Sequence, residues 1–70
     1  MRILDLENVY KYFSMVNKPY YKIQHFEGNI NIIKGIALNS TTNETEAFGL
    51  KLNADHSINF KIGSSEEVIP

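Results

Sequence analysis

Few residues of this 70-residue chain have the type and spacing that enzymatic chemistry requires. The sequence has no cysteine, which excludes a thiol nucleophile. His56 follows Asp55, but neighbouring side chains on a tight turn diverge and do not form a hydrogen-bonded dyad. Glu66 and Glu67 lie in a terminal segment that is expected to be too mobile to hold an acid and a base in place. We therefore expect no catalytic residue and no enzymatic activity.

Metal and cofactor sites are equally hard to assemble from this sequence. A metal site would need His25, His56 and a carboxylate to converge, and nothing in their spacing requires that. The glycines are too scattered to form a loop that cradles a phosphate: Gly28, Gly35, Gly49 and Gly63. We expect neither a metal nor a cofactor.

The length and composition indicate one small domain. A chain of this size buries only about 60% of the surface that it exposes when unfolded, so its stability is marginal without a partner or a second copy. The formal net charge of −1 is unlike that of a strongly basic nucleic-acid binder. The N-terminus lacks the pattern of a signal peptide, and no apolar run could span a bilayer. We expect a cytoplasmic protein without membrane contact.

The N-terminal segment has the pattern of a capped amphipathic helix from Leu6 to Asn17. Asp5 is a suitable N-cap residue, since its carboxylate can accept hydrogen bonds from the free amides of the first turn. Apolar residues recur at helical spacing on one face: Leu6, Val9, Phe13 and Val16. Pro19 ends the helix.

The remainder predicts an antiparallel meander of about four strands, because short connections join the segments. The expected strands are Tyr20 to Phe26, Ile30 to Leu38, Glu46 to Asn53 and Ser57 to Gly63. Residues 64–70 are predicted to be a flexible C-terminal tail, which leaves residues 1–63 as a single α+β domain. The helix must bury its apolar stripe against one face of this sheet.

The alternation of apolar residues predicts which side chains face the helix. In the last two strands these are Phe48, Leu50, Leu52, Ile58, Phe60 and Ile62. In the second strand the apolar row is Ile30, Ile32, Ile36 and Leu38, interrupted by Lys34. The first strand is ambiguous, and we place Tyr21, Ile23 and His25 inward because the opposite set contains lysine and glutamine.

One helix covers only one face of a sheet, and we call the other the open face. The alternation predicts that it carries Tyr20, Lys22, Phe26, Ile33, Lys51 and Lys61. Five of these are our candidate binding residues: Tyr20, Lys22, Phe26, Lys51 and Lys61. Aromatic side chains with interleaved lysines suit either an acidic protein or stacked bases, whereas the alternative interpretation is a solvated surface that keeps the sheet soluble.

Three functional hypotheses follow from these observations. The leading one is a non-enzymatic binding protein that occludes a protein partner, similar in kind to small phage or mobile-element inhibitors of host factors. The alternative is a small nucleic-acid or nucleotide binder, against which the lack of arginine on the open face argues. A minor hydrolase is the third. A homodimer is also expected, because a second buried surface would stabilise so short a chain.

Overall fold

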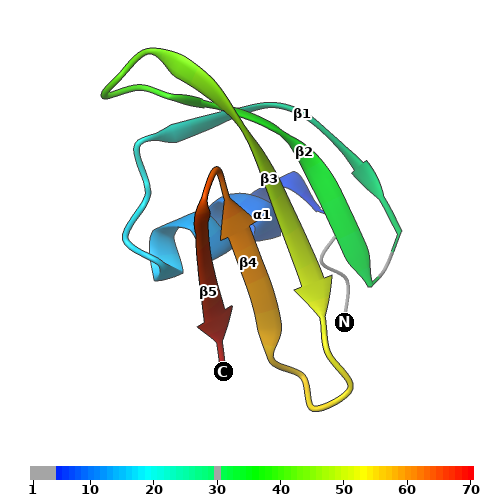
Figure 1. The fold of residues 1–70 in the computed structure, drawn as a ribbon. Coiled ribbons are helices and arrows are strands. Elements are labelled where there is room, and N and C mark those ends of the chain that lie inside the picture. Colours follow the sequence, from blue (N-terminus) through cyan, green and yellow to red (C-terminus); the bar gives the residue numbers. More distant parts are fainter. Residues whose placement is uncertain (1–4, 30) are drawn as a thin grey trace.

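The computed structural model describes residues 5–29 and 31–70 and contains one helix and one antiparallel sheet (Figure 1). The helix α1 spans Leu6–Met15. The strands are β1 (Tyr21–Gly28), β2 (Ile32–Asn39), β3 (Glu44–Leu52), β4 (Ile58–Ile62) and β5 (Ser65–Ile69). They lie in the sheet in sequence order, β1-β2-β3-β4-β5. The predicted α+β class, with a helix before a meander, is confirmed.

The helix begins where the sequence predicts and ends slightly earlier. The carboxylate of Asp5 accepts a hydrogen bond from the amide of Glu7 at 3.0 Å, which caps the first turn. The predicted end at Asn17 is wrong by two residues, because the helix ends at Met15. Asn17 adopts the left-handed conformation with φ of 62°, and the amide of Lys18 donates to the carbonyl of Phe13, which closes the C-terminus.

A fifth strand replaces the predicted flexible tail. β5 pairs with β4 from Ile62↔Ser65 to Ile58↔Ile69 and forms an edge of the sheet. Gly63, with φ of 57°, opens the two-residue turn that reverses the chain, a geometry that favours glycine. Ile69 is buried in the core, so the domain extends through this strand.

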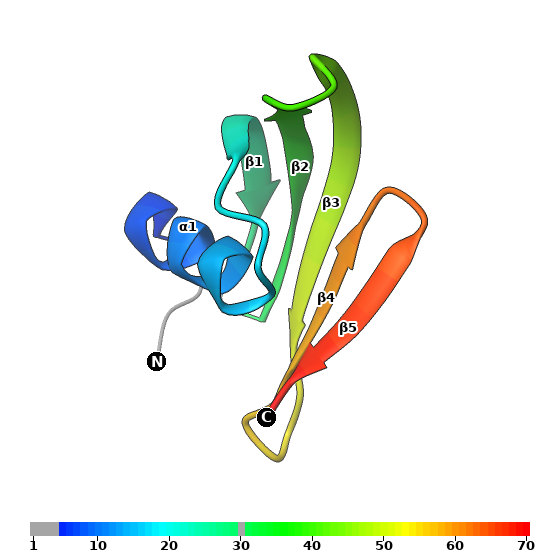
Figure 2. The ribbon, with the colours of Figure 1, turned by 90° about the vertical axis from the view of Figure 1, so that its left-hand side faces the viewer.

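The core lies between α1 and one face of the sheet (Figure 2). Phe13 of α1 is fully buried and contacts three rings from different strands. The ring centroids lie 5.4 Å from Tyr21, 5.2 Å from Phe48 and 4.9 Å from Phe60. The inward residues predicted for the last two strands are confirmed, with Leu52 only partly buried.

A bulge in β1 reverses the predicted inward and outward directions of the side chains in the second half of the strand. The pairing with β2 shifts register between Ile23 and His25, so an extra residue enters the strand there. Tyr21 and Ile23 face the helix as predicted, but beyond the bulge the alternation is reversed. Phe26 therefore packs against the core, and His25 is exposed on the opposite face. The predictions for Phe26 and His25 are wrong for this reason.

The phase predicted for the second strand is also wrong. Ile33 and Ala37 are buried, whereas Ile32 and Ile36 are about half exposed. Ile30 lies outside the described residues. The row that contains Ile32, Lys34 and Ile36 therefore points away from the helix, and Lys34 faces solvent as lysines usually do.

A polar cluster closes the inner face beyond the apolar core. The hydroxyl of Tyr21 donates to a carboxylate oxygen of Glu46 at 2.8 Å, and the side-chain amide of Asn39 donates to both groups at 3.3 Å. The side-chain oxygen Oδ1 of Asn39 accepts hydrogen bonds from the backbone amides of Thr41 and Thr42 in the β2–β3 turn. Each polar group thus has partners, which removes the cost of burying it.

Candidate functional site

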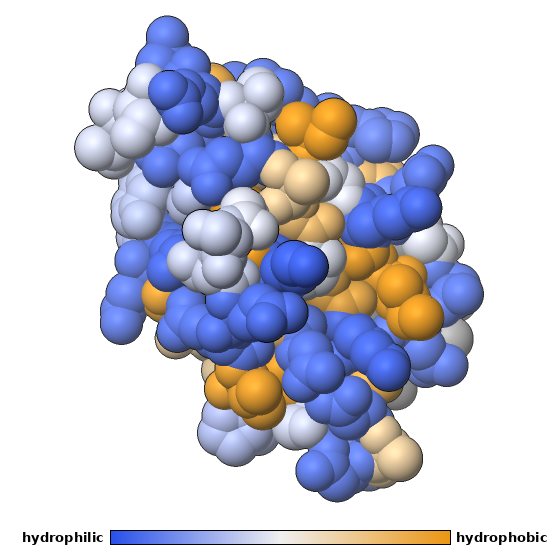
Figure 3. Space-filling view, in the orientation of Figure 1, coloured by the Kyte–Doolittle hydropathy of each residue, from blue (hydrophilic) through white to orange (hydrophobic). Residues whose placement is uncertain are grey.

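The open face is the surface of the sheet that α1 leaves uncovered, and it is turned toward the viewer in Figure 1. Strand alternation and register assign sixteen residues to this face: Lys22, Gln24, His25, Glu27, Ile32, Lys34, Ile36, Leu38, Thr45, Ala47, Gly49, Lys51, Asn59, Lys61, Glu66 and Val68. In the same orientation, Figure 3 shows apolar residues gathered near the middle of this face, among hydrophilic ones. The surface is therefore mixed rather than uniformly polar.

A row of charges crosses the open face through all five strands. The register places Glu27 beside Lys34, Lys34 beside Gly49, Gly49 beside Lys61 and Lys61 beside Glu66. The row therefore reads glutamate, lysine, glycine, lysine, glutamate from one edge of the sheet to the other. Its centre, on the middle strand, has no side chain.

Two shallow hollows flank the side chain of Lys34. The first, of about 260 Å³, has Gly49 in its lining and is called the Gly49 hollow below; its exposed lining includes Ile32, Lys34, Lys51 and Lys61. The second, of about 250 Å³, lies over β1, β2 and β3, with Ile36, Ala47 and His25 in its lining. Both form because the outward residues in the middle of β3, Ala47 and Gly49, are small while their neighbours are long.

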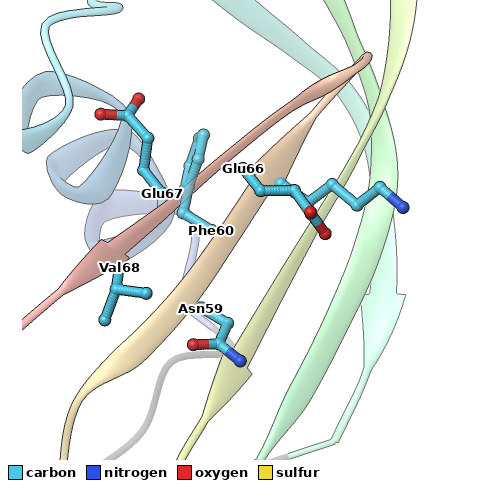
Figure 4. Close-up of a pocket in the computed structure, with 6 residues that line it drawn as sticks. Asn59, Phe60, Glu66, Glu67 and Val68 are labelled. Atoms are coloured by element: carbon cyan, nitrogen blue, oxygen red, sulfur yellow. The ribbon is translucent and has the colours of Figure 1, made fainter.

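A third hollow, of about 280 Å³, lies against the β4–β5 hairpin (Figure 4). Figure 4 shows that Phe60 and Glu67 project toward the helix, whereas Glu66 and Asn59 project away from it. Glu67 forms an ion pair with Lys18 at 3.3 Å, which ties the segment after α1 to β5. This hollow borders the Gly49 hollow, since Lys61 and Glu66 line both.

The structure separates the five predicted binding residues. Lys51 and Lys61 meet at the hollow over Gly49. Lys22 is exposed on the same face but lies opposite Leu38, toward another part of the sheet. Tyr20 precedes β1 and is 40% exposed, with its ring 5.1 Å from that of Tyr21. Phe26 is partly buried against the core on the helix side of the sheet and is not part of this surface.

Sequence reasoning missed four residues of the two hollows. Ile32, Lys34 and Ile36 belong to the row that was assigned inward, and Gly49 was given no role beyond its place in the alternation. The signal for the first three was the lysine itself, because an apolar row that contains a lysine is more often the exposed one. A glycine in the middle of a clean strand pattern was the signal for the fourth.

The lysines around the Gly49 hollow are available for contacts. Among residues 5–29 and 31–70, no carboxylate lies within ion-pair distance of Lys34, Lys51 or Lys61. Glu27, the cross-strand neighbour of Lys34, instead lies 3.9 Å from the exposed ring of His25. The surface therefore offers three positive charges beside exposed aliphatic side chains.

Shifted titratable groups lie elsewhere in the fold. Burial raises the pKa of Tyr12 in α1, and hydrogen bonds from Ser57 lower the pKa of Asp55 in the β3–β4 turn. No three histidine, aspartate or glutamate side chains gather closely enough to hold a metal ion within the described ranges. No helix in the described part of the chain is long and apolar enough to cross a membrane.

Comparison of the chain with protein-family models, curated proteins and solved structures found no match.

Proposed function

We propose that this protein is a non-enzymatic binding protein that holds a protein partner on the open face of its sheet and acts by occluding it. The observation that carries the proposal is the Gly49 hollow, where lysines without an ion-pair partner in the described part of the chain stand beside exposed isoleucine on the face that α1 leaves bare. Apolar area that a partner removes from water supplies affinity, and the charges around it supply orientation and selectivity.

The charge distribution supports a partner with acidic character. Four of the six lysines in the chain lie on the open face, against two glutamates, although the whole chain has a net charge of −1. The isoleucines at positions 32 and 36 are 48% and 46% exposed, and Val68 is 64% exposed. Alternating aliphatic and basic groups match a protein surface of aliphatic and acidic groups.

The geometry weakens the nucleic-acid alternative. Base stacking needs aromatic rings on the exposed face, and Phe26 instead packs against the core on the other face. The described open face carries no phenylalanine, tyrosine or tryptophan. Lysines without stacking rings would give only salt-sensitive contacts with phosphates.

The biological setting of the proposal rests on the small size of the chain and on its one open sheet face. We place the protein in the cytoplasm, as an inhibitor of phage or mobile-element type that blocks a host factor by covering it. Small size and a single binding face suit that role, since occlusion needs no catalytic group.

Selection from a library of random 12-residue peptides on phage tests the proposal. Selected peptides are measured against two charge reversals, Lys61→Glu on the open face and Lys11→Glu on the exposed side of α1. We expect binding to fall about tenfold or more for Lys61→Glu and to change little for Lys11→Glu. Peptides that bind both variants equally would contradict the proposal. A second outcome would also contradict the proposal: single-stranded oligothymidylate binds the wild type at low salt, Lys61→Glu abolishes that binding, and no selected peptide is sensitive to Lys61→Glu.

The predicted homodimer stays a separate proposal and would use a different surface. A second copy could pack its open face on the first with aligned strands and Gly49 opposite Gly49. Because the central charge row is symmetric about Gly49, the lysines of one copy would then face the lysines of the other and repel them. The free edge of β5 is the surface that we propose instead. Sedimentation at micromolar concentration should give twice the 8.0 kDa chain mass, and the mass of a single chain would contradict it.

A further inference from the structure

Of the four glycines, Gly49 stands apart because the described structure leaves room for a side chain there. A Cβ atom built at Gly35 would collide with the carbonyl of His25, and one at Gly28 with the carbonyl of Ile32. Gly63 adopts a left-handed backbone in the turn before β5. At Gly49 a Cβ atom would come no closer than 3.6 Å to the carbonyl oxygen of Ile33, an ordinary contact, and the φ angle is not left-handed.

A glycine in the middle of a central strand has a cost. It loses more conformational freedom on folding than any other residue and contributes no side chain to cross-strand packing. Since the fold does not require glycine at position 49, the bare backbone there needs another explanation. Close approach by a bound molecule is one recognised reason for a glycine inside a strand, and another, a bulge, is absent here because β3 pairs in regular register with both neighbours at Gly49.

The two cross-strand neighbours of Gly49 identify the chemistry of that molecule. Lys34 and Lys61 flank it on β2 and β4, so their Cα atoms are separated by two strand spacings, roughly 10 Å. A side chain seated over Gly49 would lie within reach of both flexible lysines. Two ammonium groups on either side of one position favour a negative charge between them.

We propose that Gly49 is the seat for an acidic side chain of the partner, held between Lys34 and Lys61, with an aliphatic neighbour of that acid resting on Ile32. The proposal rests on the proposed function, because it names the group that the partner inserts. Lys51, two residues further along β3 on the same face and also in the hollow, adds a third positive charge. The carboxylate accepts hydrogen bonds from the ammonium groups, which are stronger than neutral ones because both partners are charged.

Nuclear magnetic resonance titration with two short peptides tests the seat. The probes are acetyl-Ile-Glu-Ile-amide and its uncharged match, acetyl-Ile-Gln-Ile-amide. The glutamate peptide is expected to shift the backbone amides of Gly49, Lys34 and Lys61 and to bind about tenfold more tightly than the glutamine peptide. Lys34→Gln or Lys61→Gln should remove most of this preference, while Lys11→Gln on the helix should leave it unchanged.

The outcomes separate the seat from the proposed function. If both peptides bind equally at Gly49, the acidic seat is overturned while binding on the open face is retained. If neither peptide shifts Gly49, or the shifts fall on α1 or the β5 edge, the seat is overturned, and the peptide selection decides the proposed function independently.

Discussion

The hydroxyl of Tyr21 donates a 2.8 Å hydrogen bond to the carboxylate of Glu46, and this pair links the edge strand β1 to the middle strand β3 across β2. Tyr21 is only 7% exposed, and its ring contacts Phe13 of the helix. Burial, with the hydrogen bond to Glu46 and its charge, raises the pKa of Tyr21 from 10.0 to about 12.

This pair predicts a loss of stability in alkali. The folded state holds the Tyr21 proton up to a pKa of about 12, whereas the unfolded state loses it near 10.0, so the free energy of unfolding falls as the pH rises through this interval. Urea unfolding at fixed pH values measures the slope. Tyr21→Phe should flatten it, leaving the part due to Tyr12, whose pKa burial also raises. An unchanged slope in Tyr21→Phe would contradict the assignment.

Phe60 is predicted to be indispensable to the core. It is 1% exposed and meets the ring of Phe13 edge to face. Phe60→Ala should cost about 3–5 kcal/mol, which is comparable to the whole stability of a domain this small. Thermal melting followed by circular dichroism should show loss of the cooperative transition, while Met15→Ala, at a position 53% exposed, should melt like the wild type. Similar melting of Phe60→Ala and wild type would show that this core is wrong.

The strand β5 offers a matched pair of neighbours on opposite faces. Ile69 is 6% exposed and Val68 is 64% exposed. Ile69→Ala is expected to lower the free energy of unfolding by about 2 kcal/mol, whereas Val68→Ala should change it by less than about 0.5 kcal/mol. Equal effects in urea unfolding would mean that residues 64–70 behave as the tail that the sequence predicted.

The sequence predicted the fold well where the alternation was clean. Phe48 and Leu50 in β3 and Phe60 in β4 follow one period without interruption, so their inward face was read correctly. The prediction failed in β1 because the bulge before His25 depends on how β1 pairs with β2. The sequence of β1 alone does not contain that information. In β2, both phases carry isoleucine, and Lys34 was the one residue that marked the exposed row.

The candidate site was predicted only in part. Lys51 and Lys61 were identified because β3 and β4 alternate regularly, and the same alternation placed Gly49 beside them. Gly63-Ser64 is a recognised hairpin dipeptide, and it could have revealed β5. The unused space at Gly49 could not be predicted, because it depends on what lies within contact distance of the backbone.

Substitution of Gly49 is expected to stabilise the fold. Gly49→Ala should raise the free energy of unfolding by roughly 0.5–1 kcal/mol, because alanine loses less conformational freedom on folding and meets no closer contact than 3.6 Å. Gly35→Ala should lower it, since its Cβ atom would collide with the His25 carbonyl. Destabilisation by Gly49→Ala in urea unfolding would show that the fold requires this glycine after all.

The affinity of the selected peptides for Gly49→Val, compared with Thr45→Val, tests the central claim most directly. Both substitutions place a valine on the open face of β3, but only the first adds bulk where there was no side chain and fills the hollow, whereas Thr45→Val exchanges a hydroxyl for a methyl group outside it. If the open face is the binding surface, Gly49→Val should keep or raise the thermal stability while peptide affinity falls about tenfold or more, and Thr45→Val should bind like the wild type. Undiminished affinity in a folded Gly49→Val variant would contradict the account.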